Sequence, residues 1–175
     1  MSEAPGTPKV GNLQDLLAVA YQIEADAVER YKLLADQMEA HNNPELVKIF
    51  RDLARAEGIH GEEIRRMAGD FDIIEHASKI AKFAGDSPEE ADLSGAHYLM
   101  TPWHALQLSL KGEERALAYF TSIVATTTDP EVKKMAAELV EEETEHVNLV
   151  HRLLRKYPEP RASWADDLDP PQSQE

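Results

Sequence analysis

Hydrophobic side chains recur in alternating steps of three and four residues along four long segments of the chain. This spacing places them on one face of an α-helix, where they can pack against other helices. The segments are rich in alanine, leucine, glutamate, lysine and arginine, which favour helix formation. Pro44, Pro102 and Pro130 each follow an asparagine, threonine or aspartate, a pattern typical of a helix start. The sequence therefore predicts four long helices, at residues 12–40, 44–68, 102–126 and 130–156.

The connections between these helices predict their arrangement. Short turns join the first helix to the second and the third to the fourth, so each pair forms an antiparallel hairpin. The intervening segment is too long for a turn, and its apolar residues predict a short amphipathic helix: Ile73, Ile74, Ala77, Ile80 and Ala81. Residues 85–94 are predicted to form a loop. Two hairpins joined by a long crossover are one known way to close a four-helix bundle, so we predict an all-α fold of this kind.

The ends of the chain differ in composition from the helical part. Residues 1–11 lack a helical pattern, and we expect them to be disordered. Residues 157–175 are rich in proline and acidic residues, which predicts a mobile tail with Trp164 exposed. The domain is therefore expected to span residues 12–156, with its crossover at 69–101.

Each predicted hydrophobic face contains one glutamate near its middle, and two of the faces contain a histidine one turn later. These residues are Glu24, Glu57, His60, Glu113, Glu143 and His146. Burying an unpaired carboxylate costs several kcal/mol, and four carboxylates that converge in one bundle also repel one another. Two divalent cations would balance the four charges, and the two imidazoles would each supply a nitrogen ligand. Mixed carboxylate and imidazole ligation suits iron or manganese, so the sequence predicts a dinuclear metal site.

The two hairpins repeat this pattern in register. When Pro44 is aligned with Pro130, equivalent residues match: Glu57 with Glu143, His60 with His146, Glu24 with Glu113, Ala27 with Ala116 and Tyr31 with Phe120. The three-residue spacing within each Glu-x-x-His pair puts both side chains on one helix face. One such pair is common and usually solvated. Two in register, each matched by a glutamate on the neighbouring helix, favour metal binding.

Neighbouring acids leave alternatives open. Glu114 competes with Glu113, although it lies one position off the hydrophobic face. Glu142 competes with Glu143, although only Glu143 has a histidine three residues later. A plain bundle whose acids lie in hydrated grooves is the alternative to a metal site. The remaining histidines lie off the hydrophobic faces or in loops and are not expected to bind metal: His41, His76, His97, His104 and His151.

Three glycines lie inside predicted helices beside the proposed ligands: Gly58, Gly61 and Gly112. A glycine inside a helix costs about 1 kcal/mol relative to alanine. These glycines either make room for a ligand, an oxidant or a neighbouring helix, or are tolerated defects. Tyr31 lies on the same face as Glu24 and is our candidate catalytic residue, as a hydrogen-bond donor or an electron donor. Core packing is the alternative, and Phe120 at the equivalent position shows that the hydroxyl is needed at most once.

Composition narrows the classes of partner. The chain has 33 acidic and 18 basic residues and a formal net charge of −15, which argues against binding to nucleic acid or to anionic membrane surfaces. It contains no apolar run long enough to span a bilayer and no secretory signal pattern at its start, so we expect a cytoplasmic protein. The absence of cysteine excludes disulfides and thiolate-ligated metal centres.

At these residues the sequence resembles the ferritin-like superfamily, and most nearly the rubrerythrin-like diiron carboxylate proteins. The resemblance covers residues 12–156 and depends on the pattern of glutamates and Glu-x-x-His pairs. It implies a ferritin-like bundle that holds two iron ions, with manganese as an alternative metal. In that family's arrangement Glu57 and Glu143 would bridge the metals, Glu24 and Glu113 would be terminal ligands, and His60 and His146 would each bind one metal.

The resemblance also implies an activity, the oxidation of ferrous iron by peroxide or oxygen in peroxide defence or iron handling. Without cysteine the chain carries no rubredoxin-type domain, so electrons would come from an external donor or from ferrous iron itself. Rubrerythrins usually have a second carboxylate one turn from the third-helix glutamate, where this chain has Leu110 and Ala116, which predicts a more symmetric, bacterioferritin-like site. We expect a homodimer. Ferritin-type iron storage and a diiron hydroxylase of an organic substrate are the alternative functions.

Overall fold

The computed structural model of the chain describes residues 8–84 and 100–161. The first seven residues, the predicted loop at 85–94 and the tail from residue 162, with Trp164, lie outside the described residues. The described part contains five helices and no strand: α1 (Leu13–Ala40), α2 (Pro44–Ala68), α3 (Ile73–Ala84), α4 (Pro102–Thr126) and α5 (Pro130–Lys156). The predicted all-α fold is confirmed.

Side-chain caps fix where the long helices begin. Asn12 accepts a hydrogen bond from the backbone N–H of Asp15, and Asn43 accepts one from that of Leu46. Asp129 accepts from two backbone N–H groups in the first turn of α5. These oxygens satisfy donors that the first turn of a helix leaves without a partner, and the prolines at the first helical positions need no partner.

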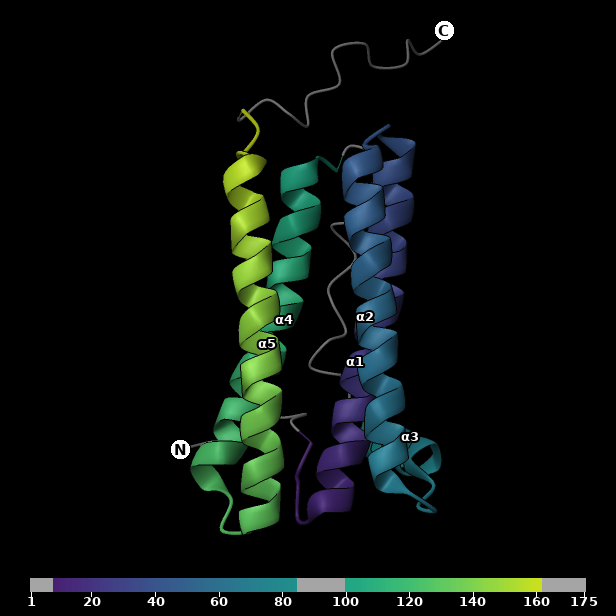
Figure 1. Ribbon diagram of the computed structural model, residues 1–175, viewed down its shortest axis with the longest axis vertical. Coiled ribbons are helices and arrows are strands. Elements are labelled where there is room, and N and C mark those ends of the chain that lie inside the picture. The colour runs from purple at the N-terminus through teal and green to yellow at the C-terminus, as the bar shows by residue number, and fades with distance from the viewer. Residues whose placement is uncertain (1–7, 85–99, 162–175) are drawn as a thin grey trace, which may run out of the picture.

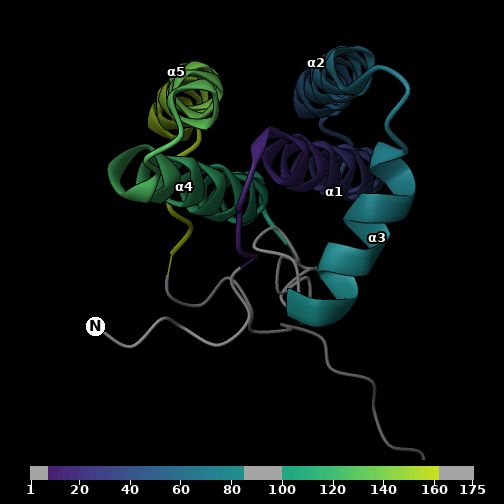
Figure 2. The ribbon, with the colours of Figure 1, turned by 90° about the horizontal axis from the view of Figure 1, so that it is seen from below.

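The helices form two hairpins that stand side by side. Figure 1 shows α1 and α2 as one antiparallel pair and α4 and α5 as the other. Seen along the bundle, α1 lies beside α4 on one side and α2 and α5 lie on the other, while α3 packs against α1 (Figure 2). This is the ferritin-like arrangement that the spacing of the hairpins predicts.

The core is divided into two apolar clusters along the bundle axis. One contains Ile23, Phe120 and Leu139, together with residues near them in sequence. The other contains Leu34, Phe50 and residues near them. In each long helix the proposed ligands lie between the residues that belong to one cluster and those that belong to the other. The fold therefore places one polar layer in the middle of an apolar bundle.

Met67 and Ile74 occupy apolar positions of the helical patterns, and their expected place in the core is wrong. Met67 is 57% exposed, because it lies in the last turn of α2, where the chain leaves the bundle toward α3. Ile74 is 55% exposed, because α3 packs on α1 through the face that carries Ile73 and Ala77. Leu117 and Val124 are only half-buried, and the neighbouring Ala116 and Ile123 are buried in their place.

Candidate metal centre

The polar layer brings together all six residues that the sequence singles out. Glu24, Glu57, Glu113 and Glu143 come from four different helices, and each is no more than 4% exposed. The two histidines, one turn after the glutamates of α2 and α5, are half-buried. Four helices therefore supply carboxylates to one region, and two of them also supply an imidazole.

Potential ligand atoms converge in three overlapping groups, and within each group they lie within 4.8 Å of one another. The groups are Glu57 with His60 and His146, Glu113 with Glu143 and His146, and Glu24 with His60 and Glu142. Glu142, which competes with Glu143 in the sequence, therefore lies at the same centre without replacing it. Glu114, the competitor of Glu113, is exposed to solvent.

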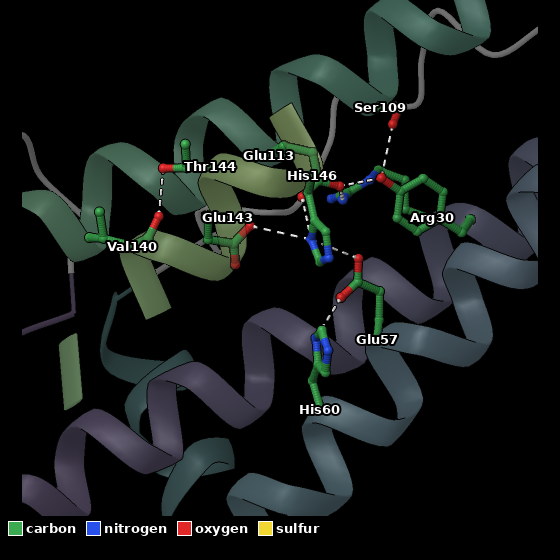
Figure 3. A network of polar contacts seen from close by, with 10 residues as sticks. Arg30, Glu57, His60, Ser109, Glu113, Val140, Glu143, Thr144 and His146 are labelled. Atoms are coloured by element: carbon green, nitrogen blue, oxygen red, sulfur yellow. Dashed lines mark hydrogen bonds and ion pairs between the residues drawn. The ribbon is translucent and has the colours of Figure 1, made fainter. Parts of the chain in front are cut away.

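Glu57 lies between the two histidines (Figure 3). Its Oε1 lies 3.2 Å from His146 Nδ1, and its Oε2 lies 3.5 Å from His60 Nδ1. The two imidazole rings are nearly parallel, with their centroids 5.7 Å apart. His146 Nδ1 also lies 3.4 Å from Glu113 Oε2 and 3.8 Å from Glu143 Oε2. One carboxylate thus faces both histidines, and one histidine faces three carboxylates.

The buried atoms at this centre fit a bound metal ion. Glu57 Oε1, His60 Nδ1 and His146 Nδ1 are shielded from solvent and make no hydrogen bond within the described residues. A buried polar atom without a partner costs about 1–3 kcal/mol. All three are atoms that coordinate metals, and a cation among them would satisfy each one. Mixed oxygen and nitrogen donors of this kind suit iron or manganese.

The pKa shifts of the residues at this centre also fit a bound cation. Burial and the nearby charge of Glu57 raise the pKa of Glu24 well above its usual range. Burial, together with the charges of Glu113 and Glu57, raises the pKa of Glu143 to about 10. Contact with Glu57 raises the pKa of His60. Without a cation these groups hold protons, which a divalent metal ion would displace on binding.

Glu113 differs from Glu24 and Glu143. Burial by itself would raise the pKa of this carboxyl, but His146, the charge of Arg30 and the Tyr31 hydroxyl together lower the pKa to about 2. Arg30 Nη2 donates to Glu113 Oε1 over 2.8 Å, and the guanidinium is 2% exposed. Tyr31 donates to the same oxygen, and its hydroxyl also lies 3.0 Å from that of Ser109. Glu113 is therefore a carboxylate held by a buried cation and a phenol.

Sequence reasoning missed Arg30 and assigned no role to Glu142. Arg30 flanks the hydrophobic face of α1, where helical periodicity cannot distinguish a buried arginine from a solvated one. The signal that could have found it is Gly112, because a methyl group there would overlap the Arg30 guanidinium. Of the possible reasons for this glycine, the structure shows that it makes room for a side chain of a neighbouring helix.

Gly58 and Gly61 have a different surrounding. A Cβ atom at either position would make only ordinary contacts with α1, at 3.9 Å from Val28 and 3.5 Å from Glu24. A cavity of about 270 Å³ lies over both glycines, between α1 and α2, and its lining includes Glu24 and Glu57. The absence of side chains from this part of α2 therefore opens a hollow beside two of the proposed ligands.

The chain is similar in sequence to a known protein family and in sequence and structure to a solved protein. The family model described as rubrerythrin matches residues 15–97, which contain α2, all of α1 but its first two residues, and the proposed ligands Glu24, Glu57 and His60. A crystal structure of an uncharacterized conserved protein from Magnetospirillum magnetotacticum MS-1 is 36% identical in sequence, with a TM-score of 0.71. The similarity covers 85% of this chain and 97% of that one. The chain belongs to the rubrerythrin family of the ferritin-like superfamily.

The second hairpin of this rubrerythrin-family chain lies outside the matched family region, and its assignment depends on the structure. Glu113, Glu143 and His146 lie opposite the matched hairpin's ligands and complete the same pattern. No curated protein matches the chain. Within the described residues, no helix is both long enough and apolar enough to cross a membrane.

Proposed function

We propose that this rubrerythrin-family chain is a diiron oxidoreductase, which oxidises ferrous iron with peroxide or oxygen. The observation that carries the proposal is the convergence of four buried glutamates and two histidines. Within the described residues, three of their potential metal-ligand atoms are buried without a hydrogen-bond partner. Two divalent ions would neutralise the four carboxylates. Manganese has similar ligand preferences and is the alternative metal.

The positions of the side chains support a role for each ligand. Glu57 presents different oxygens to His60 and to His146, which suits a carboxylate that bridges two metals. Glu143 lies beside Glu113 and His146 and would be the second bridge. Glu24 and Glu113, on the other two helices, would each bind one metal, as would His60 and His146.

When bound, two ferrous ions together supply the two electrons that reduction of one peroxide requires. Apolar clusters close the centre on both sides along the bundle, and a cavity between α1 and α2 lies beside Glu24 and Glu57. Tyr31 keeps its hydroxyl proton at neutral pH, since burial and the nearby Glu113 charge raise the pKa of this tyrosine. The Tyr31 hydroxyl therefore donates its proton in a hydrogen bond to Glu113 Oε1. Tyr31 is our candidate catalytic residue.

The need for an electron donor follows from the absence of cysteine. The chain has no cysteine to hold a rubredoxin-type iron, so re-reduction of the iron would require an external electron donor. We propose a homodimer as the working form. Sedimentation separates this assembly from a ferritin-type storage shell of many subunits, which would sediment as a single large particle.

Anaerobic loading with ferrous iron tests the proposal. We expect two irons per chain, and exposure to peroxide or to oxygen in separate samples should give the near-ultraviolet absorption of an oxo-bridged ferric pair. Glu57→Ala and His146→Ala should abolish that stoichiometry. Glu114→Gln removes an exposed acid next to a ligand and should leave it unchanged. Binding of fewer than one iron per chain, unaffected by Glu57→Ala, would contradict the proposal.

A further inference from the structure

The two halves of the centre have matching ligands but different surroundings. The alignment that pairs Glu24 with Glu113 also pairs Arg30 with Tyr119 and Tyr31 with Phe120. Around Glu113, Arg30 and Tyr31 both donate to one carboxylate oxygen. At the equivalent positions of α4, Phe120 has no hydroxyl, and Tyr119 donates its hydroxyl to the carbonyl oxygen of Pro8. The proposed ligands therefore match between the two halves in sequence, while the groups behind them differ.

Packing maintains this difference. Gly112 lies against the Arg30 guanidinium, and any larger residue would overlap it. The residue that corresponds to Gly112 in the first hairpin is Ile23, which is 2% exposed and packs in the apolar core. Ser109, whose hydroxyl contacts Tyr31, corresponds to the buried Ala20. One half of the centre is thus built to hold a cationic side chain, and the other half is filled by apolar groups.

The two terminal glutamates both lie near other carboxylates, but a buried arginine contacts Glu113 alone. Glu113 Oε1 is already occupied by two hydrogen-bond donors, which leaves Oε2 on the side of His146. Glu24 is surrounded by the carboxylates of Glu57, Glu143 and Glu142. In the described part of the chain, Glu24 forms no ion pair with a lysine or arginine. A divalent cation would therefore meet the fixed positive charge of Arg30 near Glu113, whereas the groups beside Glu24 are the carboxylate of Glu142 and the imidazole of His60, which can release its proton.

We propose that Arg30 makes the two metal positions unequal, so that a divalent cation binds tightly beside Glu24 and more weakly beside Glu113. This inference rests on the proposed dinuclear site. Arg30 acts in two ways, because it repels the ion and because it occupies one of the two oxygens that Glu113 could offer. It is a positioning residue, since it acts on the metal through Glu113.

Anaerobic titration with Co²⁺, followed by its visible absorption, tests the inference without any turnover. The wild-type chain should bind two ions in separate steps. Glu24→Gln should weaken the tight step, and Glu113→Gln should weaken the other, which assigns each step to one side of the centre. Arg30→Gln should tighten the weak step by about tenfold or more, because it removes a charge a few ångströms from the ion. It should leave the tight step nearly unchanged.

Two further variants keep the test decisive. Arg30→Lys retains the positive charge and should keep the weak step weak. If Arg30→Gln folds only in the presence of metal, the weak step of Arg30→Lys can still be compared with that of the wild-type chain. Arg55→Gln is the matched control, because Arg55 is 69% exposed and pairs with Asp52 on the surface. It should change neither step.

The results that would overturn the inference are distinct from those that would contradict the proposed function. Two equal steps in the wild-type chain, an unchanged weak step in Arg30→Gln, or the same shift in Arg30→Lys would each overturn it and leave the dinuclear site intact. Failure of the wild-type chain to bind two ions would instead contradict the proposed function, and this inference with it.

Discussion

At the scale of single residues, the proposed metal centre is a group of buried acids, two of which would have to release protons when a metal ion binds. Glu143 and Glu24 lie in apolar surroundings among other carboxylates, and their raised pKa values record the cost of charging them there. Glu113 is different, because Arg30 and Tyr31 stabilise its charged form. In the metal-free chain Glu24 and Glu143 therefore favour the protonated form, and binding of a metal ion would displace these protons.

The stability of the metal-free chain should fall as the pH rises from about 6 to about 9. In the unfolded chain glutamate titrates near pH 4.3 and histidine near 6.5. The folded pKa values of Glu143, Glu24, His60 and His146 are all raised, so across this range the folded state binds more protons and loses stability with pH. The lowered pKa of Glu113 acts oppositely and only in acid, where its stabilisation is lost as the pH falls from about 4.3 toward 2.

Urea unfolding of chelator-treated protein at several pH values measures this slope. Glu143→Gln should reduce the slope, because the substituted side chain cannot titrate. Saturating Mn²⁺ should abolish it or reverse it, since metal affinity rises with pH. The same slope with and without metal would show that these glutamates are not the ligands.

Tyr31→Phe tests the candidate catalytic residue directly. Phenylalanine occupies the equivalent position 120, so the substitution should fit the core and cost about 1 kcal/mol through the lost hydrogen bond to Glu113. We expect two bound irons and slower oxidation by peroxide, measured by stopped-flow absorption. An unchanged oxidation rate would assign Tyr31 to packing alone.

At the scale of helices, the sequence predicts what depends on periodicity and capping. The four long helices begin and end within one residue of the predicted bounds, because Asn12, Asn43 and Asp129 cap their starts. The proposed ligands could be recognised because acids interrupt an otherwise apolar face. Arg30 could not, because its partner Glu113 is 83 residues away and its own position flanks the apolar face. Glu142 also lies off the apolar face of its helix. It reaches Glu24 and His60 because α5 packs against the other hairpin, which the sequence pattern does not reveal.

The same substitution at two helix glycines should have opposite effects. Gly58→Ala should raise the free energy of unfolding by up to about 1 kcal/mol, because the new Cβ fits and alanine favours the helix. Gly112→Ala should lower it by about 1–3 kcal/mol, because the methyl group overlaps the Arg30 guanidinium. Thermal and urea unfolding of the metal-free variants measure both. Equal effects of the two substitutions would contradict the tight packing of Arg30 against Gly112.

At the scale of the whole molecule, the metal centre lies where the two hairpins meet. Each hairpin contributes two glutamates and one histidine, so bound metal would link α1 and α2 to α4 and α5. The net charge of −15 includes the four buried glutamates, whose charge two divalent ions would balance. The remaining acids give the surface a negative potential, which concentrates cations such as ferrous iron around the molecule.

Diffraction from an iron-loaded crystal at the iron absorption edge tests the central claim most directly. The account predicts two anomalous peaks per chain, about 3.5–4 Å apart, as in other two-metal sites. One peak should contact Glu24 and His60, and the other should contact Glu113 and His146, with Glu57 and Glu143 between them. Peaks found only on the acidic surface, or an unoccupied layer between the two hairpins, would contradict it.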